Sequence, residues 1–372
     1  MTGQIPWLES LMPWPEEFGL GRMRELLHAL GDPQRSFRAI HVVGTNGKTT
    51  TTRLAEALLA GAGLAVGAYT SPHVVGWSER IRVRGAEADL EEALARVREQ
   101  AEALGATQFE VLTAAALAEF AIAEVDVAVV EAGLGGRYDA TNVLDAPVVV
   151  LTNVALEHTE VLGDTREAIA AEKLAVVPPG ATVVLGEPEW EEAARAAGAE
   201  SVVVAGHSNL ALAIAASESF LGRPVAAPAA EDVVVRGRLE RVADDPLEIW
   251  DGAHNLAGVG WLLARLPSRQ YVVAASILGD KDVDGMLAAL SALGEHLVAT
   301  SSSNERALSA EDLAAHADRF FRQIDVVPDP SAAVARARQA AGHEGAVLVT
   351  GSLYLLADLV AVRPATAVPW RP

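Results

Sequence analysis

A glycine-containing turn followed by a lysine is the segment whose residue types point most clearly to chemistry. Residues 40–50 read Ile-His-Val-Val-Gly-Thr-Asn-Gly-Lys-Thr-Thr, with an apolar strand pattern before the turn and a helical pattern after it. Backbone N–H groups at such a turn and at a helix N-terminus bind phosphate oxygens. Lys48 would add a charge for the β- and γ-phosphates, and a following hydroxyl can reach Mg²⁺. The spacing is shorter than in the common phosphate loop, whose leading glycine would fall at Val42. The lysine and the threonines nevertheless favour nucleotide binding over a plain strand–turn–helix corner.

Lysine is rare in this chain. It occurs only at Lys48, Lys173 and Lys281, and the other basic residues are arginines. A lysine kept in such a composition indicates a site that needs a compact amine, one that can lose its proton or be modified. Chance is the alternative for any one of the three.

Two further polar residues follow apolar strand patterns. Glu131 ends the run 127–131 and precedes a glycine-rich segment, 133–136. A carboxylate at a strand end is where nucleotide-hydrolysing folds hold a metal, although a solvated strand end is the alternative. His158 also follows a strand and could bind a metal, with Lys173 on the next helix. A lone histidine is as often structural.

The expected strands and helices alternate along most of the chain. Strands are predicted at 39–43, 66–69, 127–131, 148–151, 182–185, 201–204, 247–250, 271–275, 297–300, 324–327 and 346–350, and helices at 49–62, 90–104 and 111–124. This pattern predicts an α/β chain with a mainly parallel, doubly wound sheet. The Pro- and Ala-rich stretch 223–231 interrupts it, so we place a domain boundary between about 223 and 237. We expect a P-loop-type domain over 1–230 and a smaller Rossmann-like α/β domain over 231–372.

Length and composition exclude several classes of function. The 372 residues exceed one typical core, and 51% of them are hydrophobic. A net charge of −21 makes nucleic acid an unfavourable partner. The absence of cysteine removes disulfides and thiol chemistry. The first seven residues do not read as a secretion signal, and no apolar run reaches membrane-spanning length. We therefore expect a cytoplasmic protein without a membrane partner.

Taken together, the motifs resemble the folylpolyglutamate synthase/dihydrofolate synthase family of the Mur ligase superfamily. The likeness covers almost the whole chain. It rests on residues 18–23, 30–34, 40–50, 70–73, 79–82, 109–110, 133–142, 158–173, 251–255 and 351–354.

The resemblance implies an ATP-dependent, ADP-forming ligase that adds L-glutamate to a folate-type carboxylate through an acyl phosphate. By the same resemblance, ATP would contact Thr45, Asn46, Gly47, Lys48, Thr49, Thr50, Asn209, Arg238 and Asp251. Ser71, Glu131 and His158 match the family's Mg²⁺ ligands, and Lys173 matches a lysine that becomes carbamylated and helps to hold a second Mg²⁺. Lys48, His158 and Lys173 are the expected catalytic residues. Phe109, Glu110, Tyr138, Asp139 and Ala140 match the pterin side, and His254 and Asn255 would lie near ATP or glutamate.

The chain departs from the family pattern at two positions. Thr49 stands where the family usually has glycine, and a threonine at this position is more like the cell-wall Mur ligases. Leu256 stands where the family usually has proline. A cell-wall ligase acting on a UDP-MurNAc peptide is therefore the second hypothesis. A non-catalytic nucleotide switch is a third, but it has no use for Lys173 or Asp251. The expected partners are a folate or pteroate, L-glutamate and ATP, and the expected state is a monomer.

Overall fold

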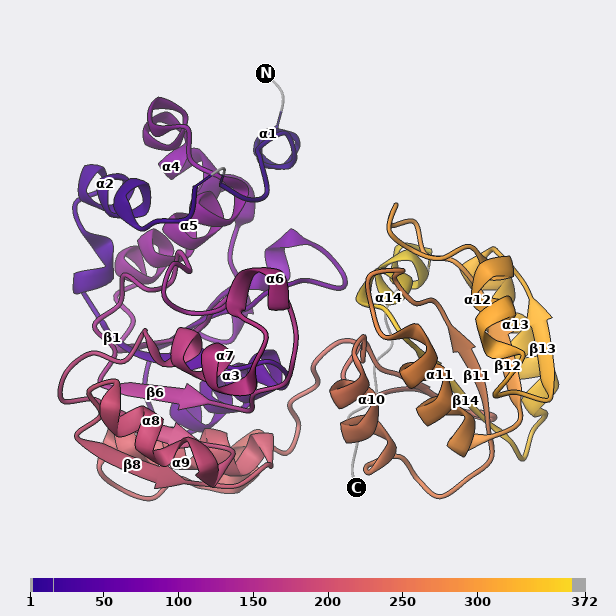
Figure 1. Cartoon of the computed structure of the whole chain (residues 1–372). Helices are drawn as coiled ribbons and strands as arrows, with labels where there is room; N and C mark the ends of the chain where they lie inside the picture. The colour runs from indigo at the N-terminus through magenta and orange to yellow at the C-terminus, as the bar shows by residue number, and fades with distance from the viewer. Residues whose placement is uncertain (1–2, 16, 363–372) are drawn as a thin grey trace. The chain divides into compact units, whose positions relative to one another are not determined.

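The computed structural model describes residues 3–15 and 17–362. The chain divides into two units, Met1–Val233 and Val234–Pro372 (Figure 1). The division falls just after the Pro- and Ala-rich stretch 223–231, three residues beyond the boundary that the sequence predicts after residue 230. Each unit is built around its own sheet.

The first unit contains an eight-stranded sheet with the order β4-β3-β2-β5-β1-β6-β7-β8. Its strands are β1 (Arg38–Val43), β2 (Val66–Tyr69), β3 (Ile81–Val83), β4 (Ala86–Glu87), β5 (Val127–Glu131), β6 (Val148–Leu151), β7 (Thr182–Leu185) and β8 (Ser201–Val204). All neighbours pair in parallel except β2 with β3 and β3 with β4, which are antiparallel.

Helices cover both faces of this sheet because its central strands are apolar on both sides. The longer helices are α2 (Gly21–Ala29), α3 (Lys48–Gly61), α4 (Leu90–Leu104), α5 (Gln108–Ile122), α7 (Arg166–Leu174) and α9 (Asn209–Leu221). The shorter ones are α1 (Gln4–Glu9), α6 (Thr159–Leu162) and α8 (Glu191–Ala196). Ile40 and Val42 of β1 pack in one core cluster with residues of α3 and α9. Ala39 and Val43 pack in another with residues of α4, α5 and α7.

The strand order reverses beside β1. The chain passes from β1 to β2 on one side, inserts β5 between them, and then continues with β6, β7 and β8 on the other side. Open α/β sheets bind ligands outside the carboxyl ends of the strands at such a reversal. The carboxyl ends of β1, β5 and β6 are therefore the expected ligand site of the first unit.

The second unit contains a six-stranded sheet with the order β13-β12-β11-β14-β10-β9. Its strands are β9 (Glu240–Asp244), β10 (Leu247–Trp250), β11 (Tyr271–Ala275), β12 (His296–Ala299), β13 (Gln323–Val326) and β14 (Ala346–Thr350). Its helices are α10 (Leu256–Leu263), α11 (Val283–Leu290), α12 (Ala310–Ala317), α13 (Pro330–Ala341) and α14 (Leu353–Ala361). Only β9 pairs antiparallel. One apolar cluster that includes Val259, Met286 and Leu348 forms its core.

The predicted fold class is confirmed, with local differences. The helix expected at 111–124 begins at Gln108, because Thr107 caps it. The Thr107 hydroxyl accepts a hydrogen bond from the Glu110 N–H, and the Glu110 carboxylate accepts one from the Thr107 N–H at 2.8 Å. The antiparallel strands β3, β4 and β9 were not predicted. Across the part of the chain that the structure describes, no helix combines the length and apolar character needed to cross a bilayer.

Candidate functional site

The loop between β1 and α3 is held in place by the residues that follow β6. The N–H groups of Thr45 and Asn46 donate to the carbonyl and the side-chain oxygen of Asn153, each at 2.9 Å. The Asn153 amide and the Thr152 hydroxyl donate back to the Asn46 carbonyl at 3.1 and 2.7 Å. The N–H groups of Thr45 and Asn46 are thus used inside the protein. The N–H groups that can face an anion are those of residues 47–50, at the start of α3.

Two glycines of this loop are required by its geometry. Gly44 has a φ of +145°, and a methyl group placed there would lie 1.9 Å from Oγ1 of Thr152. Gly47 has a φ of +84°, and a methyl group there would lie 2.5 Å from Oδ1 of Asn209. The structure therefore brings Asn209, at the start of α9, against the loop for which the sequence predicts ATP binding.

Two lysines share one carbonyl of the loop. Lys48 donates to the carbonyls of Gly44 and Thr45 at 3.1 and 3.2 Å, and Lys173 donates to that of Gly44 at 2.9 Å. Lys173 is only 4% exposed. Burial lowers the pKa of Lys173 to about 7, and the nearby charge of Lys48 adds to the lowering, while Glu157 and Asp139 oppose it. A large share of this amine is therefore uncharged at neutral pH.

Glu131, at the end of β5, is buried beside the loop. One carboxylate oxygen accepts a hydrogen bond from the Thr49 hydroxyl at 3.0 Å, and the other accepts from the Ser71 N–H at 3.0 Å. Thr49 belongs to the first turn of α3, and Ser71 follows β2. The structure therefore gathers three of the predicted ATP and metal residues, and it is the hydroxyl of Thr49 that faces the carboxylate.

The chemistry of this group fits a hard cation. Carboxylate and hydroxyl oxygens are the ligands that Mg²⁺ prefers, and Mg²⁺ usually keeps several of its waters. Over residues 3–15 and 17–362, no three His, Cys, Asp or Glu side chains gather as a metal cluster. His158, the third predicted ligand, precedes α6 with a φ of +51°. Its side chain is 38% exposed, and its Nδ1 lies 4.0 Å from Oε1 of Glu160.

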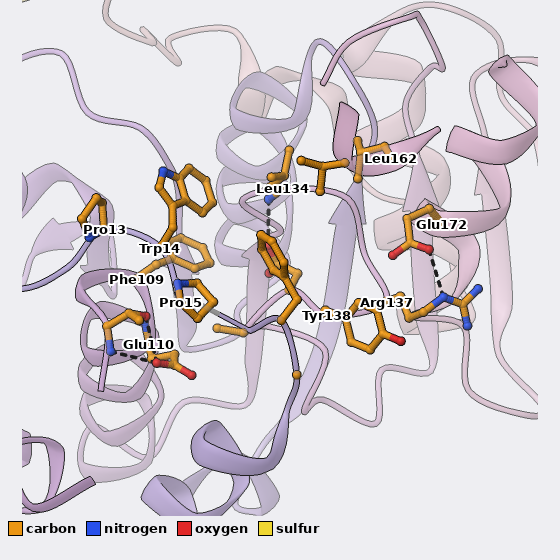
Figure 2. A pocket seen from close by; sticks show the side chains of 16 residues that line it. Pro13, Trp14, Pro15, Phe109, Glu110, Leu134, Arg137, Tyr138, Leu162 and Glu172 are labelled. Atoms are coloured by element: carbon orange, nitrogen blue, oxygen red, sulfur yellow. Dashed lines mark hydrogen bonds and ion pairs between the residues drawn. The ribbon is translucent and has the colours of Figure 1, made fainter. Parts of the chain in front are cut away.

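A pocket of about 330 Å³ lies on the same unit (Figure 2). Its wall includes four aromatic rings, and it brings together all five residues predicted for the pterin side. It is lined by Pro13, Trp14, Pro15, Phe18, Gly19, Thr107, Phe109, Glu110, Leu134, Arg137, Tyr138, Asp139, Ala140, Val161, Leu162 and Glu172.

The two acidic residues predicted for this pocket are held by hydrogen bonds. Glu110 accepts from Arg22 Nε and from the Thr107 hydroxyl, each at 2.8 Å. Asp139 accepts from the Leu134 N–H at 2.8 Å, and burial raises the pKa of Asp139. Both carboxylates therefore have fixed positions in the pocket wall.

Helix α7 joins the pocket to the loop between β1 and α3 (residues 44–47) through adjacent residues. Glu172 lines the pocket and accepts a hydrogen bond from Arg137 Nε at 2.9 Å (Figure 2). Lys173, the next residue, reaches the carbonyl of Gly44. The turn after β5 packs tightly on this helix, because a methyl group at Gly136 would lie 2.6 Å from the carbonyl oxygens of both Glu172 and Lys173. Pocket and loop are therefore neighbouring parts of one site.

In the second unit, Asp251 follows β10 and is buried. Its oxygens accept from the N–H groups of Leu239 and Ala253, each at 2.8 Å. Burial raises the pKa of Asp251, and the charge of Arg238 opposes this. Arg238 itself donates to the carbonyl of Gly237 at 3.2 Å. The two residues predicted to contact ATP from this unit are thus electrostatic neighbours at one strand end.

The two remaining predicted residues follow Asp251 directly. The ring of His254 donates from Nδ1 to the carbonyl of Gly252 at 2.7 Å. Oδ1 of Asn255 accepts from the Gly258 N–H at 2.7 Å and caps α10. The Asn255 side chain therefore has a structural task in addition to any contact with a ligand.

Sequence reasoning missed several residues of this site. Thr152 and Asn153 hold the loop between β1 and α3, and their signal was a polar pair directly after the buried run 148–151. Trp14 lines the pocket, and its signal was a Pro-Trp-Pro run before the first long helix. Arg22 pairs with Glu110, which lies far away in the sequence, so no local pattern could have indicated it.

Comparison with known proteins places these features in a family. Residues 42–221 match the Mur ligase middle domain, and residues 237–353 match the Mur ligase, glutamate ligase domain. The Mycobacterium tuberculosis dihydrofolate synthase/folylpolyglutamate synthase is 34% identical, covering 83% of this chain and 80% of its own.

Solved structures agree with this match. Escherichia coli FolC in complex with DHPP and ADP superposes with a TM-score of 0.87 at 30% identity, over 97% of each chain. The bifunctional enzyme from Yersinia pestis, complexed with AMPPNP and Mn ion, gives a TM-score of 0.87 at 31% identity over 97% of this chain and 98% of that one. The chain belongs to the folylpolyglutamate synthase/dihydrofolate synthase family of Mur ligases.

Proposed function

We propose that the protein is an ATP-dependent, ADP-forming ligase that joins L-glutamate to the carboxylate of a folate-type acid, either dihydropteroate or a tetrahydrofolate. The observation behind this is the position of α7, whose Glu172 lines the aromatic pocket and whose Lys173 contacts the phosphate loop. One rigid element thus connects a pocket for a flat ring with a site for phosphate. A reaction between a ring-bearing acid and ATP needs this arrangement.

The pocket supports a pterin ring in particular. Trp14, Phe18, Phe109 and Tyr138 offer faces and edges against which a flat heteroaromatic ring can pack. Buried Glu110 and Asp139 add acceptors of fixed direction. The FolC structure that contains DHPP and ADP supports the same assignment. We assign the pterin side to Phe109, Glu110, Tyr138, Asp139 and Ala140.

The reaction has two steps. An oxygen of the substrate carboxylate attacks the γ-phosphorus, the bond to the β–γ bridging oxygen breaks, and ADP leaves, so that an acyl phosphate forms. The uncharged amine of glutamate then attacks the acyl carbon, inorganic phosphate leaves, and the nitrogen loses one proton to solvent. Positioning and charge neutralisation dominate such phosphoryl transfer. Lys48 and the N–H groups of residues 47–50 would orient the β- and γ-phosphates.

Ser71 and Glu131 would supply oxygen ligands for Mg²⁺, and His158 would supply a nitrogen. When bound, Mg²⁺ neutralises charge on the phosphate oxygens. Glu131 is already oriented by Thr49 and Ser71. The Yersinia pestis structure with AMPPNP and Mn ion supports a divalent cation in this family.

We also propose that Lys173 is carbamylated. Its amine nitrogen would form a bond to the carbon of CO₂ and release one proton, which gives an anion. Burial favours the uncharged amine that this addition requires, and the neighbouring Lys48 would attract the resulting anion where it now repels a cation. The carbamate would help to hold a second Mg²⁺, a task that arginine cannot perform.

The first unit would therefore bind ATP and the pterin-bearing acid, and the second would be the glutamate-ligase domain. Asn209 would contact ATP from α9, and Arg238 and Asp251 from the second unit. His254 and Asn255 would lie near ATP or glutamate. We propose that the chain acts as a monomer, which its mass in solution will test.

The test is an ADP-release assay run with dihydropteroate, with a tetrahydrofolate, and with a UDP-muramoyl acid, each with and without glutamate. We expect ADP only when a folate-type acid and glutamate are both present, with the amide identified by mass spectrometry. ADP released with the UDP-muramoyl acid instead would assign the chain to cell-wall chemistry.

A further inference from the structure

A fully buried histidine lies on the central strand, three residues before the phosphate loop. His41 has no exposed surface, and its Nε2 lies 2.8 Å from Oγ1 of Thr141. Its strand, β1, runs between β5 and β6. Nothing in the proposed reaction uses this side chain, and a histidine in a sheet core is costly to bury unless it is hydrogen-bonded.

The bond between Thr141 and Asp139 decides whether His41 donates to Thr141 or accepts from it. The Thr141 hydroxyl donates its single hydrogen to Oδ1 of Asp139. Oγ1 of Thr141 must then accept from His41, so the proton of the ring lies on Nε2. Burial lowers the pKa of His41 to about 4, which keeps the ring neutral. Among the described residues, Nδ1 has no hydrogen-bond partner, so the bond to Thr141 is the one hydrogen bond that this side chain makes there.

Asp139 is where this chain of contacts meets the pocket. Its Oδ1 also accepts from the Thr141 N–H at 3.0 Å, and its Oδ2 accepts from the Leu134 N–H at 2.8 Å. These two bonds tie together the ends of loop 134–141. Five residues of the loop line the pocket: Leu134, Arg137, Tyr138, Asp139 and Ala140. A shift of the carboxylate would therefore move one wall of the pocket.

We propose that His41 is a positioning residue for the pterin-bearing substrate, because it orients Thr141, which in turn holds the Asp139 carboxylate and the pocket loop. This rests on the proposed function for the identity of the substrate. Through Thr141, His41 connects the loop to β1, which is hydrogen-bonded to a strand on each side. The effect is expected on the acid substrate and not on ATP, because Asp139 lines the pocket while the phosphate loop is held by Thr152 and Asn153.

The experiment compares two pairs of variants. Thr141→Val removes the hydroxyl at constant shape, and Thr141→Ser keeps it. His41→Phe removes the ring N–H at similar volume, and His41→Gln keeps a donor near the position of Nε2. KM is measured separately for the folate-type acid and for ATP, and binding of the acid is measured by calorimetry. Ser217→Ala is the control, because it deletes a buried hydroxyl of α9 that has no hydrogen-bond partner among the described residues.

We expect Thr141→Val and His41→Phe each to raise KM for the acid about tenfold, with KM for ATP changed less than about twofold. Thr141→Ser should stay close to wild type. The double variant His41→Phe/Thr141→Val should be no weaker than either single one, because both break the same connection. Should His41→Phe fail to fold, Thr141→Val and Thr141→Ser still test the link from Thr141 to Asp139. His41→Gln then tests His41 itself, because a retained donor should keep KM for the acid closer to the wild-type value.

Three results would overturn the inference: Thr141→Val binding the acid like wild type, equal increases in KM for the acid and for ATP, or multiplied effects in the double variant. A wild-type protein that neither binds a folate-type acid nor releases ADP with it would instead contradict the proposed function. The two failures are therefore distinguishable.

Discussion

Replacement of Lys173 tests the chemistry of the site most directly. With a pKa of about 7, the buried amine is about half uncharged at pH 7. At the ordinary lysine value of 10.5, only about one amine in 3,000 would be uncharged at that pH. The fold therefore raises the fraction able to add CO₂ roughly a thousandfold. Below pH 7 the amine gains a proton, and the proton released on CO₂ addition opposes carbamate formation further. Turnover of the partly carbamylated protein should therefore fall more than about fivefold between pH 7 and pH 6 at constant dissolved CO₂.

Two substitutions separate the roles that Lys173 can have. Lys173→Arg keeps a positive charge and cannot form a carbamate, whereas Lys173→Met keeps the length of the side chain and has no charge. We expect both variants to bind ATP and to lose most ADP release. In the wild-type protein, labelled bicarbonate should give a carbamate carbon signal by ¹³C NMR that both variants lack.

The outcomes differ for each competing role. Wild-type turnover in Lys173→Arg would mean that a permanent positive charge at this position is enough for catalysis. Wild-type turnover in Lys173→Met would mean that an uncharged side chain of this length is enough. Either result refutes the carbamate. The melting temperature of each variant checks that lost turnover does not reflect unfolding.

Three further outcomes are expected. Gly47→Ala should weaken ATP binding more than about tenfold in calorimetry. A left-handed φ of +84° costs a residue with a side chain about 1–2 kcal/mol, and the added methyl group would lie 2.5 Å from Oδ1 of Asn209. Gly63→Ala is the control and should bind ATP normally, because Gly63 also has a positive φ, of +94°, but has nothing within 4 Å. Between pH 6.5 and pH 4 the unfolded chain binds more protons at His41 than the native protein does. The free energy of unfolding should therefore fall on acidification by up to about 3 kcal/mol more in the wild-type protein than in His41→Phe. Urea titrations at the two pH values measure this, and equal losses in the two proteins would contradict it. Arg338→Met leaves the fully buried Glu248 without its ion pair. The free energy of unfolding of the second unit, measured by urea denaturation, should therefore fall by about 3–5 kcal/mol. A loss below about 1 kcal/mol would show that the pair contributes little to stability.

Much of the fold could be predicted because its signals are local. Strands such as β5 and β6 are continuous apolar runs, and their predicted bounds match the structure. The antiparallel strands escaped prediction for a physical reason. β3 has three residues and β4 has two, which is too few to show a strand pattern, and β4 lies at the edge of the sheet. The family resemblance was confirmed, since it rested on motifs spread over nearly the whole chain.

The site was predictable where its residues are adjacent in the sequence. The turn at Gly47 and Lys48 forms one contiguous segment, so its type and spacing already indicate phosphate. The contacts of Glu131 could not be read in this way, because Thr49 and Ser71 reach it only through the order of β2, β5 and β1 in the sheet. The predicted roles of these residues in binding ATP and metal stay predictions until they are measured.

The sequence by itself determined the α/β fold class and the family, and it predicted a phosphate-binding loop at residues 44–50. Only the tertiary structure decided which groups meet. It places Asn153, which follows β6, in hydrogen bonds with the loop between β1 and α3. It also connects His41 to Asp139 through Thr141. It also lowered the pKa of Lys173, because the proton affinity of an amine depends on the water and charges around it, and folding sets both.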